Sequence, residues 1–271
     1  MKCFFLLCFS VFGILAHVES QVEPQDQSVQ KNFTDEDGNR QGYWESEYPD
    51  GNLRYRGTFR DNHPVGEFIR FFPNGKKMAV MDFCDQGIRA EATLFYENGT
   101  MAAEGLYIEE KKDSIWKYYS YYDNQLTSME TYALGIKQGL TGVYYPNGKF
   151  SETFWYEDDL RNGPWMQYYE NGRVRLEAGF ENDQRHGEFI FYLPSGRTEI
   201  KGQYHDNKMH GEWTYYDETG KVVSVINYVE GRAENEQELI EKEQEMFRRI
   251  EEMRGRIPEP DESGIFFPNG R

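Results

Sequence analysis

Residues 163–187 read GPWMQYYENGRVRLEAGFENDQRHG, and the pattern of this stretch returns along most of the chain. Each copy opens on a small residue, usually glycine, and successive copies begin 24 or 25 residues apart. The eight copies begin at Gly42, Gly66, Ala90, Ser114, Gly139, Gly163, Gly187 and Gly211. A period of roughly 20 to 50 residues is typical of repeat architectures in which neighbouring units stack. The sequence therefore predicts an eight-unit array over residues 42–231.

Each copy is predicted to form a β-hairpin around a tight turn. In the first copy, Pro49-Asp50-Gly51 fits a three-residue turn that ends on a left-handed glycine and a bulge. The alternative is a two-residue type I′ turn, which needs a backbone N–H that proline lacks. The bulged turn places Tyr48 opposite Asn52. The predicted fold is all-β, an elongated single-sheet array of about eight 24-residue β-hairpin repeats, plus one C-terminal α-helix.

Aromatic residues recur at two positions of the repeat. One series, near the end of each second strand, is aromatic in all eight copies: Phe59, Phe83, Tyr107, Tyr132, Tyr156, Phe180, Tyr204 and Tyr228. With the register set by the bulged turn alone, this series shares a face with Tyr168 and Leu176 and forms the seam that stacks the repeats. The second series, two residues after the start glycine, is then predicted to lie on the opposite face.

The opposite face is the predicted partner-binding surface, because aromatic side chains and arginine anchor many protein interfaces. Its candidate partner-binding residues are Trp44, Tyr48, Phe68, Phe72, Trp165, Tyr169, Phe189, Trp213, Arg54, Arg56 and Arg175. The alternative is that most of these aromatic side chains only hold the sheet together. Alanine at Trp165 and Tyr169 would distinguish a binding site from a packing role.

The motif Gly-x-Trp-x-x-Tyr-Tyr-x-Asn-Gly at 163–172, with Gly179-Phe180 and Arg185-His186-Gly187 after it, resembles the variant MORN (membrane occupation and recognition nexus) repeat. Arrays of this type are similar to the YwqK-type antitoxin family of bacterial proteins, and the resemblance covers residues 42–231. It implies a β-hairpin scaffold with an antitoxin or immunity role, whose partner would be a secreted toxin.

The N-terminal segment predicts export. Met1-Lys2 precedes an apolar run from Cys3 to Leu15, so residues 1–20 are predicted to be a secretory signal peptide. An uncleaved anchor is the alternative, although the run is short for a membrane span. Residues 21–41 are predicted to be a polar linker. The expected location is periplasmic, cell-surface or extracellular, with Cys84 as the one remaining cysteine and no internal disulfide.

The C-terminal segment is predicted to cap the open edge of the array. Residues 232–257 predict an acidic amphipathic helix, with Asn235 and Glu238 spaced as in a capping box. This helix would cap the sheet or bind a partner. Residues 258–271 contain Phe-Phe-Pro-Asn-Gly, as residues 71–75 do, and predict a half-repeat that caps an edge strand or begins a ninth unit.

The sequence predicts no cofactor, no metal site and no catalytic residues, and hence not an enzyme. His186 and His210 each precede a start glycine, so they are interpreted as one loop position seen twice rather than a metal pair. Acidic pairs such as Asp158-Asp159 are interpreted as solvated loop residues. The net charge of −17 disfavours nucleic acid and anionic membranes as partners. The predicted function is an exported scaffold that binds another protein, and the alternative is a carbohydrate-binding or structural cell-surface protein.

Overall fold

The computed structural model describes residues 30–233, 244, 245 and 248. These residues contain twenty β-strands and one short 3-10 turn, η1 (Asp85–Gly87). Every strand pairing described is antiparallel. The prediction of an all-β fold built from antiparallel hairpins is confirmed. The chain divides into two compact units after Ala90.

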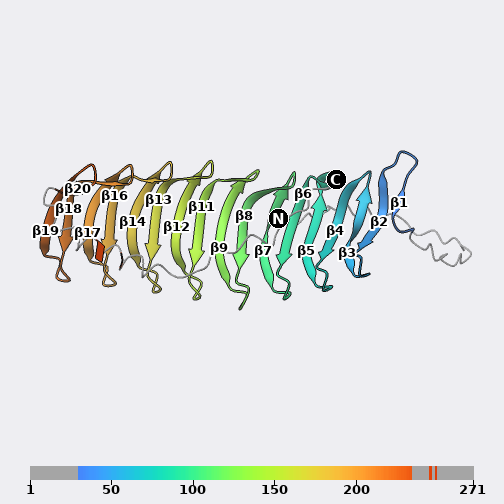
Figure 1. The fold of residues 1–271 in the computed structure, drawn as a ribbon, viewed down its shortest axis with the longest axis horizontal. Coiled ribbons are helices and arrows are strands. Elements are labelled where there is room, and N and C mark those ends of the chain that lie inside the picture. Colours follow the sequence, from blue (N-terminus) through green and yellow to red (C-terminus); the bar gives the residue numbers. More distant parts are fainter. Residues whose placement is uncertain (1–29, 234–243, 246–247, 249–271) are drawn as a thin grey trace, which may run out of the picture. The chain divides into compact units, whose positions relative to one another are not determined.

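The first unit is a run of hairpins in which each strand pairs with the next (Figure 1). Its strands are β1 (Phe33–Thr34), β2 (Arg40–Glu47), β3 (Leu53–Arg60), β4 (His63–Phe71) and β5 (Lys77–Cys84). The strand β1 falls inside the segment predicted as a linker. The strand β6 (Arg89–Phe95) begins at the last two residues of this unit.

The second unit repeats the same hairpin pattern from β7 onward (Figure 1). Its longer strands are β7 (Met101–Ile108), β8 (Lys111–Tyr119), β9 (Leu126–Ala133), β11 (Gly139–Tyr144), β12 (Phe150–Glu157), β13 (Leu160–Tyr168), β14 (Val174–Glu181), β16 (Gly187–Tyr192), β17 (Thr198–His205), β18 (Lys208–Tyr216) and β19 (Val222–Val229). Three two-residue strands complete it: β10 (Ile136–Lys137), β15 (Gln184–Arg185) and β20 (Arg232–Ala233).

The predicted bulged turn is confirmed inside the hairpins. The N–H of Gly51 donates to the carbonyl of Tyr48 at 2.9 Å, and the N–H of Tyr48 donates to the carbonyl of Asn52 at 2.8 Å. Gly51 has a φ of +86°, the left-handed conformation that this turn requires. The same two bonds close the turns at Gly75, Gly99, Gly148, Gly172, Gly196 and Gly220. The fourth repeat has a longer turn, from Ser120 to Gln125.

A second bulge follows the turn, and it corrects the predicted faces. Leu53 pairs with Glu47 and Tyr55 pairs with Ser46, so Arg54 is an extra residue that has no paired residue on the opposite strand. The extra residue recurs at Met78, Thr127, Ser151, Arg175, Glu199 and Val223. Because a one-residue shift moves every later side chain to the other face, the predicted assignment of the two aromatic series to opposite faces is wrong. Tyr168, predicted to lie in the seam with Leu176, is misplaced for the same reason.

In the second unit, residues of both aromatic series in fact build one core. The Trp213 side chain has no exposed surface and is enclosed by the rings of Phe189, Tyr204 and Tyr228, with centroids 5.2–6.1 Å away. Its indole lies against Gly202, where an added Cβ would come within 2.2 Å of the ring. We call the side of the sheet that carries these rings the aromatic face, and the other side the outer face.

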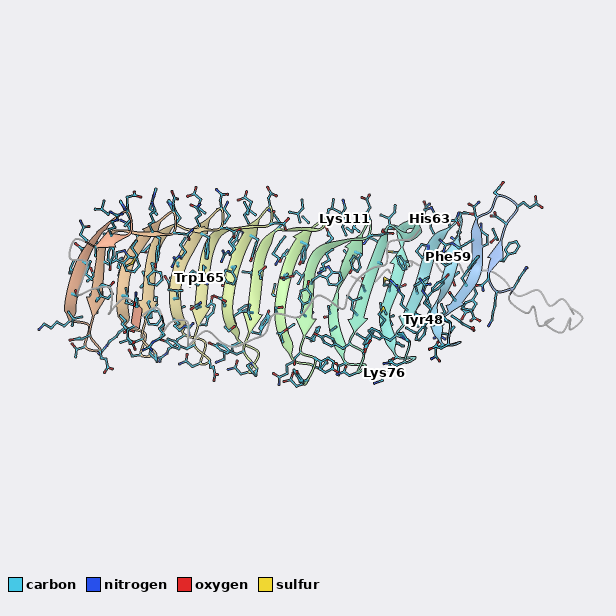
Figure 2. All side chains as sticks on the ribbon, in the orientation of Figure 1. Tyr48, Phe59, His63, Lys76, Lys111 and Trp165 are labelled. Atoms are coloured by element: carbon cyan, nitrogen blue, oxygen red, sulfur yellow. The ribbon has the colours of Figure 1, made fainter. Side chains whose placement is uncertain are left out.

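The connections between hairpins are also tight turns, not the predicted loops. Arg60 pairs with His63 across Asp61 and Asn62, whose φ angles of 49° and 69° are those of a type I′ turn. Figure 2 shows His63 and Tyr48 at opposite ends of the strands of the first unit. The acidic pair Asp158-Asp159 and the pairs Glu109-Glu110, Asn182-Asp183 and Asp206-Asn207 have the same positive φ angles. These residues are therefore turn residues, all exposed except the half-buried Asp183.

Four of these turns are bonded to a strand residue of the preceding repeat. The N–H of Asn62 donates to the carbonyl of Arg40 at 3.2 Å, and the N–H of Arg40 donates to Oδ1 of Asn62 at 2.9 Å. The same reciprocal pair joins Asp159 to Lys137 and Asn207 to Arg185, as well as Asp183 to Arg161. Successive repeats are thus tied together at this edge by backbone and side-chain hydrogen bonds.

Several predictions concern segments outside the described residues. They include the signal peptide of residues 1–20, the half-repeat of residues 258–271 and most of the helix of residues 232–257. The predicted start of that helix is wrong, because Arg232 and Ala233 pair with β19 as the strand β20. Gln244, Glu245 and Arg248 are helical, and the extent and role of the helix stay predictions. The described part of the chain contains no helix with the length and hydropathy of a membrane-spanning segment.

Candidate binding surface and histidine cluster

Most of the predicted partner-binding rings pack within the sheet. Trp165, Phe189 and Trp213 are buried, and Trp44 and Phe68 are half-buried on the same aromatic face. Figure 2 shows Trp165 in the middle of its strand, away from both edges. The contacts of these rings within the array explain their recurrence without any partner.

The predicted tyrosines form a ladder of hydrogen bonds between repeats. The hydroxyl of Tyr48 donates to the carbonyl of Phe71 at 2.8 Å, and that of Tyr169 donates to the carbonyl of Tyr192 at 2.6 Å. Tyr96 and Tyr145 make the equivalent bond. Phe72 occupies the same position of the second repeat and has no hydroxyl. Where this position is tyrosine, it therefore joins one hairpin to the next.

The three predicted arginines lie in different surroundings. Arg54 and Arg56 are exposed. Arg175 is only 4% exposed, and its Nη2 donates to Oε1 of Gln167 at 2.6 Å. Gln167 in turn donates to Oε1 of Glu152 at 2.7 Å. The structure thus places Arg175 in a buried polar row of the aromatic face, and it does not bring the three arginines together.

The outer face of the second unit carries paired charges. Lys117 lies directly opposite Glu104, and its Nζ is 2.9 Å from Oε1 of that carboxylate. The Tyr119 hydroxyl donates to the same oxygen at 2.8 Å. The hydrogen bonds from Lys117 and Tyr119 lower the pKa of Glu104. Burial and the bond to Glu104 raise the pKa of Tyr119 to about 12. Glu104 is therefore ionised at neutral pH.

Sequence reasoning missed an exposed tryptophan on the outer face. Trp155 lies between two core aromatic residues of β12 and is 48% exposed. It pairs with Leu140, whose carbonyl accepts a bond from the Thr131 hydroxyl, and Thr131 pairs with the exposed Ile115. We call these four residues, Ile115, Thr131, Leu140 and Trp155, the outer apolar row. The signal in the sequence was the third consecutive aromatic residue in Phe154-Trp155-Tyr156, because alternation sends the middle one to the other face.

The fourth repeat places a charged cluster on the aromatic face. Its longer turn puts Glu130 opposite Trp116, where it accepts bonds from Lys137 Nζ at 2.7 Å and from the Tyr132 hydroxyl at 2.5 Å. Lys112 Nζ lies 5.3 Å from the ring centroids of Trp116 and Tyr132. Burial acts to raise the pKa of Glu130, but the bonds from Lys137 and Tyr132 outweigh it and the pKa ends below its usual value. Glu130 is an ionised, internally paired group, which suits a structural role better than proton transfer.

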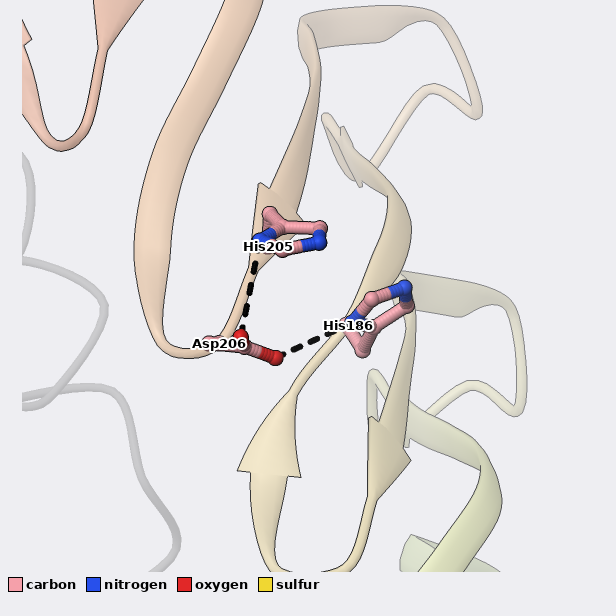
Figure 3. Close-up of side chains that lie close together, drawn as sticks. All are labelled: His186, His205 and Asp206. Atoms are coloured by element: carbon pink, nitrogen blue, oxygen red, sulfur yellow. Dashed lines mark ion pairs between the residues drawn. The ribbon is translucent and has the colours of Figure 1, made fainter.

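A second cluster gathers side chains that can ligate metal (Figure 3). His186 precedes β16, His205 ends β17 and Asp206 begins the following turn. Nδ1 of His186 lies 3.5 Å from Oδ1 of Asp206, and Nδ1 of His205 lies 3.6 Å from Oδ2. Sequence reasoning compared His186 with His210 and missed His205. The antiparallel pairing of β16 with β17 is what brings His205 beside His186.

The comparisons with known proteins agree with the hairpin array. Residues 40–61, 90–109, 161–182 and 209–230 match the model of the MORN repeat variant, MORN_2. In these four segments the chain is similar to MORN repeat variants. Three of these matches span the strand pairs β2–β3, β13–β14 and β18–β19 with their turns. The chain is thus a repeat protein, and the resemblance seen in the sequence is confirmed at this level.

Among solved structures, that of a Photorhabdus luminescens Tc holotoxin pore is similar, at 11% sequence identity and a TM-score of 0.20. The match covers 74% of this chain but only 15% of that chain. No curated protein matches this chain.

Proposed function

We propose that the protein is a non-catalytic repeat scaffold that binds another protein through the outer face of its second unit. The observation that carries this proposal is the exposure of Trp155 on that face. The tryptophans of the aromatic face are buried or half-buried in the sheet. Tryptophan is strongly enriched among the residues that dominate interface energies. Trp155 points outward while the other tryptophans pack in the sheet, so we expect it to anchor the interface.

The surroundings of Trp155 support a protein partner. The outer apolar row crosses four strands, and Ile115 at its other end is as exposed as Trp155. Charged pairs such as Lys117 with Glu104 flank it. An apolar centre with a polar margin is the usual anatomy of a protein interface. The net charge of −17 favours a partner with a basic surface and disfavours nucleic acid.

The more specific proposal is that the protein is exported and that its partner is a secreted toxin. Export rests on the apolar segment Cys3 to Leu15 behind Met1-Lys2, and the toxin rests on the resemblance to YwqK-type antitoxins. The non-catalytic role is supported by Glu130, a half-buried carboxylate of the aromatic face, which is ionised and paired with Lys137. An anionic membrane stays a disfavoured partner on the grounds of charge.

Carbohydrate binding is the second candidate function. The observation in its favour is again Trp155, because an exposed indole can stack on a sugar ring as well as on a protein. In that case neighbouring polar groups such as the Thr131 hydroxyl would have to turn toward the sugar, whereas this hydroxyl now donates to the Leu140 carbonyl at 2.8 Å. The protein partner is therefore the better supported of the two.

The test is capture with the full chain as bait, at low and high salt, from the envelope and secreted fractions of the source organism. Trp155→Ala is the test variant, and Val225→Ala is the matched control, because Val225 is an equally exposed apolar residue of the outer face. We expect one stoichiometric protein that binds wild type and Val225→Ala but binds Trp155→Ala at least about tenfold more weakly, as for an interface hot spot. All three proteins should melt alike. Full retention by Trp155→Ala would refute the site, and capture by polysaccharide alone would favour the second candidate.

A further inference from the structure

We propose that His186, His205 and Asp206 form a binding site for Zn²⁺ or a similar divalent transition metal. Neither the hairpin array nor a protein-binding role requires such a site. The three residues come from two neighbouring segments of the sheet edge, the β15–β16 connection and the end of β17 with its turn (Figure 3). Their ligand atoms all lie within 4.8 Å of one another.

The distances fit a shared ion better than direct contacts. Two ligand atoms bound tetrahedrally to zinc at about 2.0–2.1 Å are roughly 3.4 Å apart. The two histidine nitrogens lie 3.5 Å and 3.6 Å from the oxygens of Asp206. These separations are too long for normal N–H···O hydrogen bonds. Closing the site requires shifts of the side chains on the order of an ångström, which rotation about their χ angles provides.

His186 offers a second, independent observation. Its Nδ1 is shielded from solvent and makes no hydrogen bond with any described residue. This nitrogen also lies 3.5 Å from Oε2 of Glu181, as well as from Asp206. A buried ring nitrogen with no partner is costly unless something satisfies it. A cation between the nitrogen and the two carboxylates would do so, and Glu181 would supply a further oxygen ligand.

The backbone around the site is held in place before any metal binds. The N–H of His186 donates to the carbonyl of Gly179 at 3.0 Å. The turn that carries Asp206 is bonded to the strand before His186, because Asn207 and Arg185 exchange hydrogen bonds of 2.9 Å and 2.8 Å. Ligands on a fixed backbone lose little freedom on binding, which favours affinity.

The donor set and the local charge select the kind of ion. Two imidazoles with a carboxylate suit zinc, copper or nickel, whereas calcium and magnesium prefer oxygen ligands alone. The ring of His210 lies 5.9 Å from that of His205, and Glu230 is already paired with Lys208 at 2.7 Å. Three protein ligands would leave a coordination position for Glu181, water or a group from a partner.

The test is zinc titration of the metal-free full chain by calorimetry, with cobalt absorbance as a second readout. Asp206→Asn and His205→Gln are the test variants. Asp158→Asn is the matched control, because Asp158 occupies the same turn position two repeats earlier, and Asn182 shows that asparagine is accepted at that position. His63→Gln controls for exposed histidine.

We expect one zinc per chain, and at least about tenfold weaker binding in both test variants, since loss of even an outer-shell partner typically costs roughly 10- to 100-fold. The two controls should bind as wild type does, and cobalt bands typical of four-coordination should disappear only in the test variants. Equal melting temperatures of the metal-free proteins would show that the fold is intact. Absence of saturable binding, or equal binding by Asp206→Asn and Asp158→Asn, would overturn the proposal.

Discussion

Gly202 lies against the indole of Trp213, and we predict that Gly202→Ala destabilises the second unit by about 2 kcal/mol, the usual cost of overpacking a core. The added Cβ would lie 2.2 Å from the ring, so the two must separate by at least 1.2 Å (3.4 Å less 2.2 Å) to reach ordinary contact. The ring cannot retreat freely, because Phe189, Tyr204 and Tyr228 surround it and its Nε1 donates to the Gln203 carbonyl.

The assay is urea unfolding of wild type, Gly202→Ala, Trp213→Phe and the double variant. One repeat earlier, Ala178 and Phe189 occupy the positions of Gly202 and Trp213, so alanine and phenylalanine are a compatible pair there. The double variant should therefore lose about 1 kcal/mol less than the sum of the two single losses.

Gly57→Ala supplies the comparison. An added Cβ there meets Phe68 at the same 2.2 Å, but Phe68 is smaller than Trp213 and only half-buried. We expect a smaller loss than at Gly202. If Gly202→Ala cost less than about 0.5 kcal/mol, within the ordinary range of surface substitutions, or if the double variant showed no coupling, the proposed packing would be refuted.

Three further predictions concern single groups. Tyr169→Phe should lower the free energy of unfolding by about 0.5–1.5 kcal/mol in urea, because it removes the bond to the Tyr192 carbonyl while keeping the ring. Ser114→Gly should raise the melting temperature, since Ser114 has a φ of +58° where six of the other seven repeats have glycine, and this conformation costs a non-glycine residue about 1 kcal/mol. Glu130→Gln should lower the free energy of unfolding at neutral pH. The difference in this free energy between variant and wild type should become smaller below the ordinary pKa of glutamate. The reason is that a carboxylate with a lowered folded pKa stabilises above its unfolded pKa and loses this effect as pH falls through the folded value. Chemical unfolding at pH 7 and pH 3.5 would measure this difference, and an unchanged difference would contradict the pairing of Glu130.

The turns of this fold were predictable from sequence because their chemistry is local. Proline before Asp50-Gly51 excludes one turn type and fits the other, and the observed bonds at Tyr48 follow. The type I′ connections were not recognised, because acidic pairs such as Glu109-Glu110 are unusual where Asn-Gly is the common signal. In four other connections, such as Asp158-Asp159, bonds to the preceding repeat accompany the positive φ angles, and these bonds are tertiary context.

The second bulge could not be predicted from the residue that forms it. Arg54, Ser151 and Val223 all occupy the extra position, so no side-chain type marks it. Its effect is nevertheless decisive, because it moves the Trp and Phe series from the outer face to the aromatic face. For the same reason the ring residues of the predicted binding surface lie on the aromatic face, while the pairing of His186 with His205 depended on strand neighbours that only the structure shows.

The small residues beside three of the core rings support the observed assignment of faces. Gly57 and Gly105 underlie Phe68 and Trp116 in the first unit and the second unit respectively, as Gly202 underlies Trp213, and an added Cβ at any of the three would meet the ring within 2.4 Å. The pairing of a glycine with a large ring is visible in the sequence alone, since the ring follows the glycine by eleven residues in all three cases. Had the rings faced outward, the residue on the neighbouring strand would not need to be glycine. The aromatic face is therefore constrained by its own packing, and a surface for a partner is free to develop on the outer face.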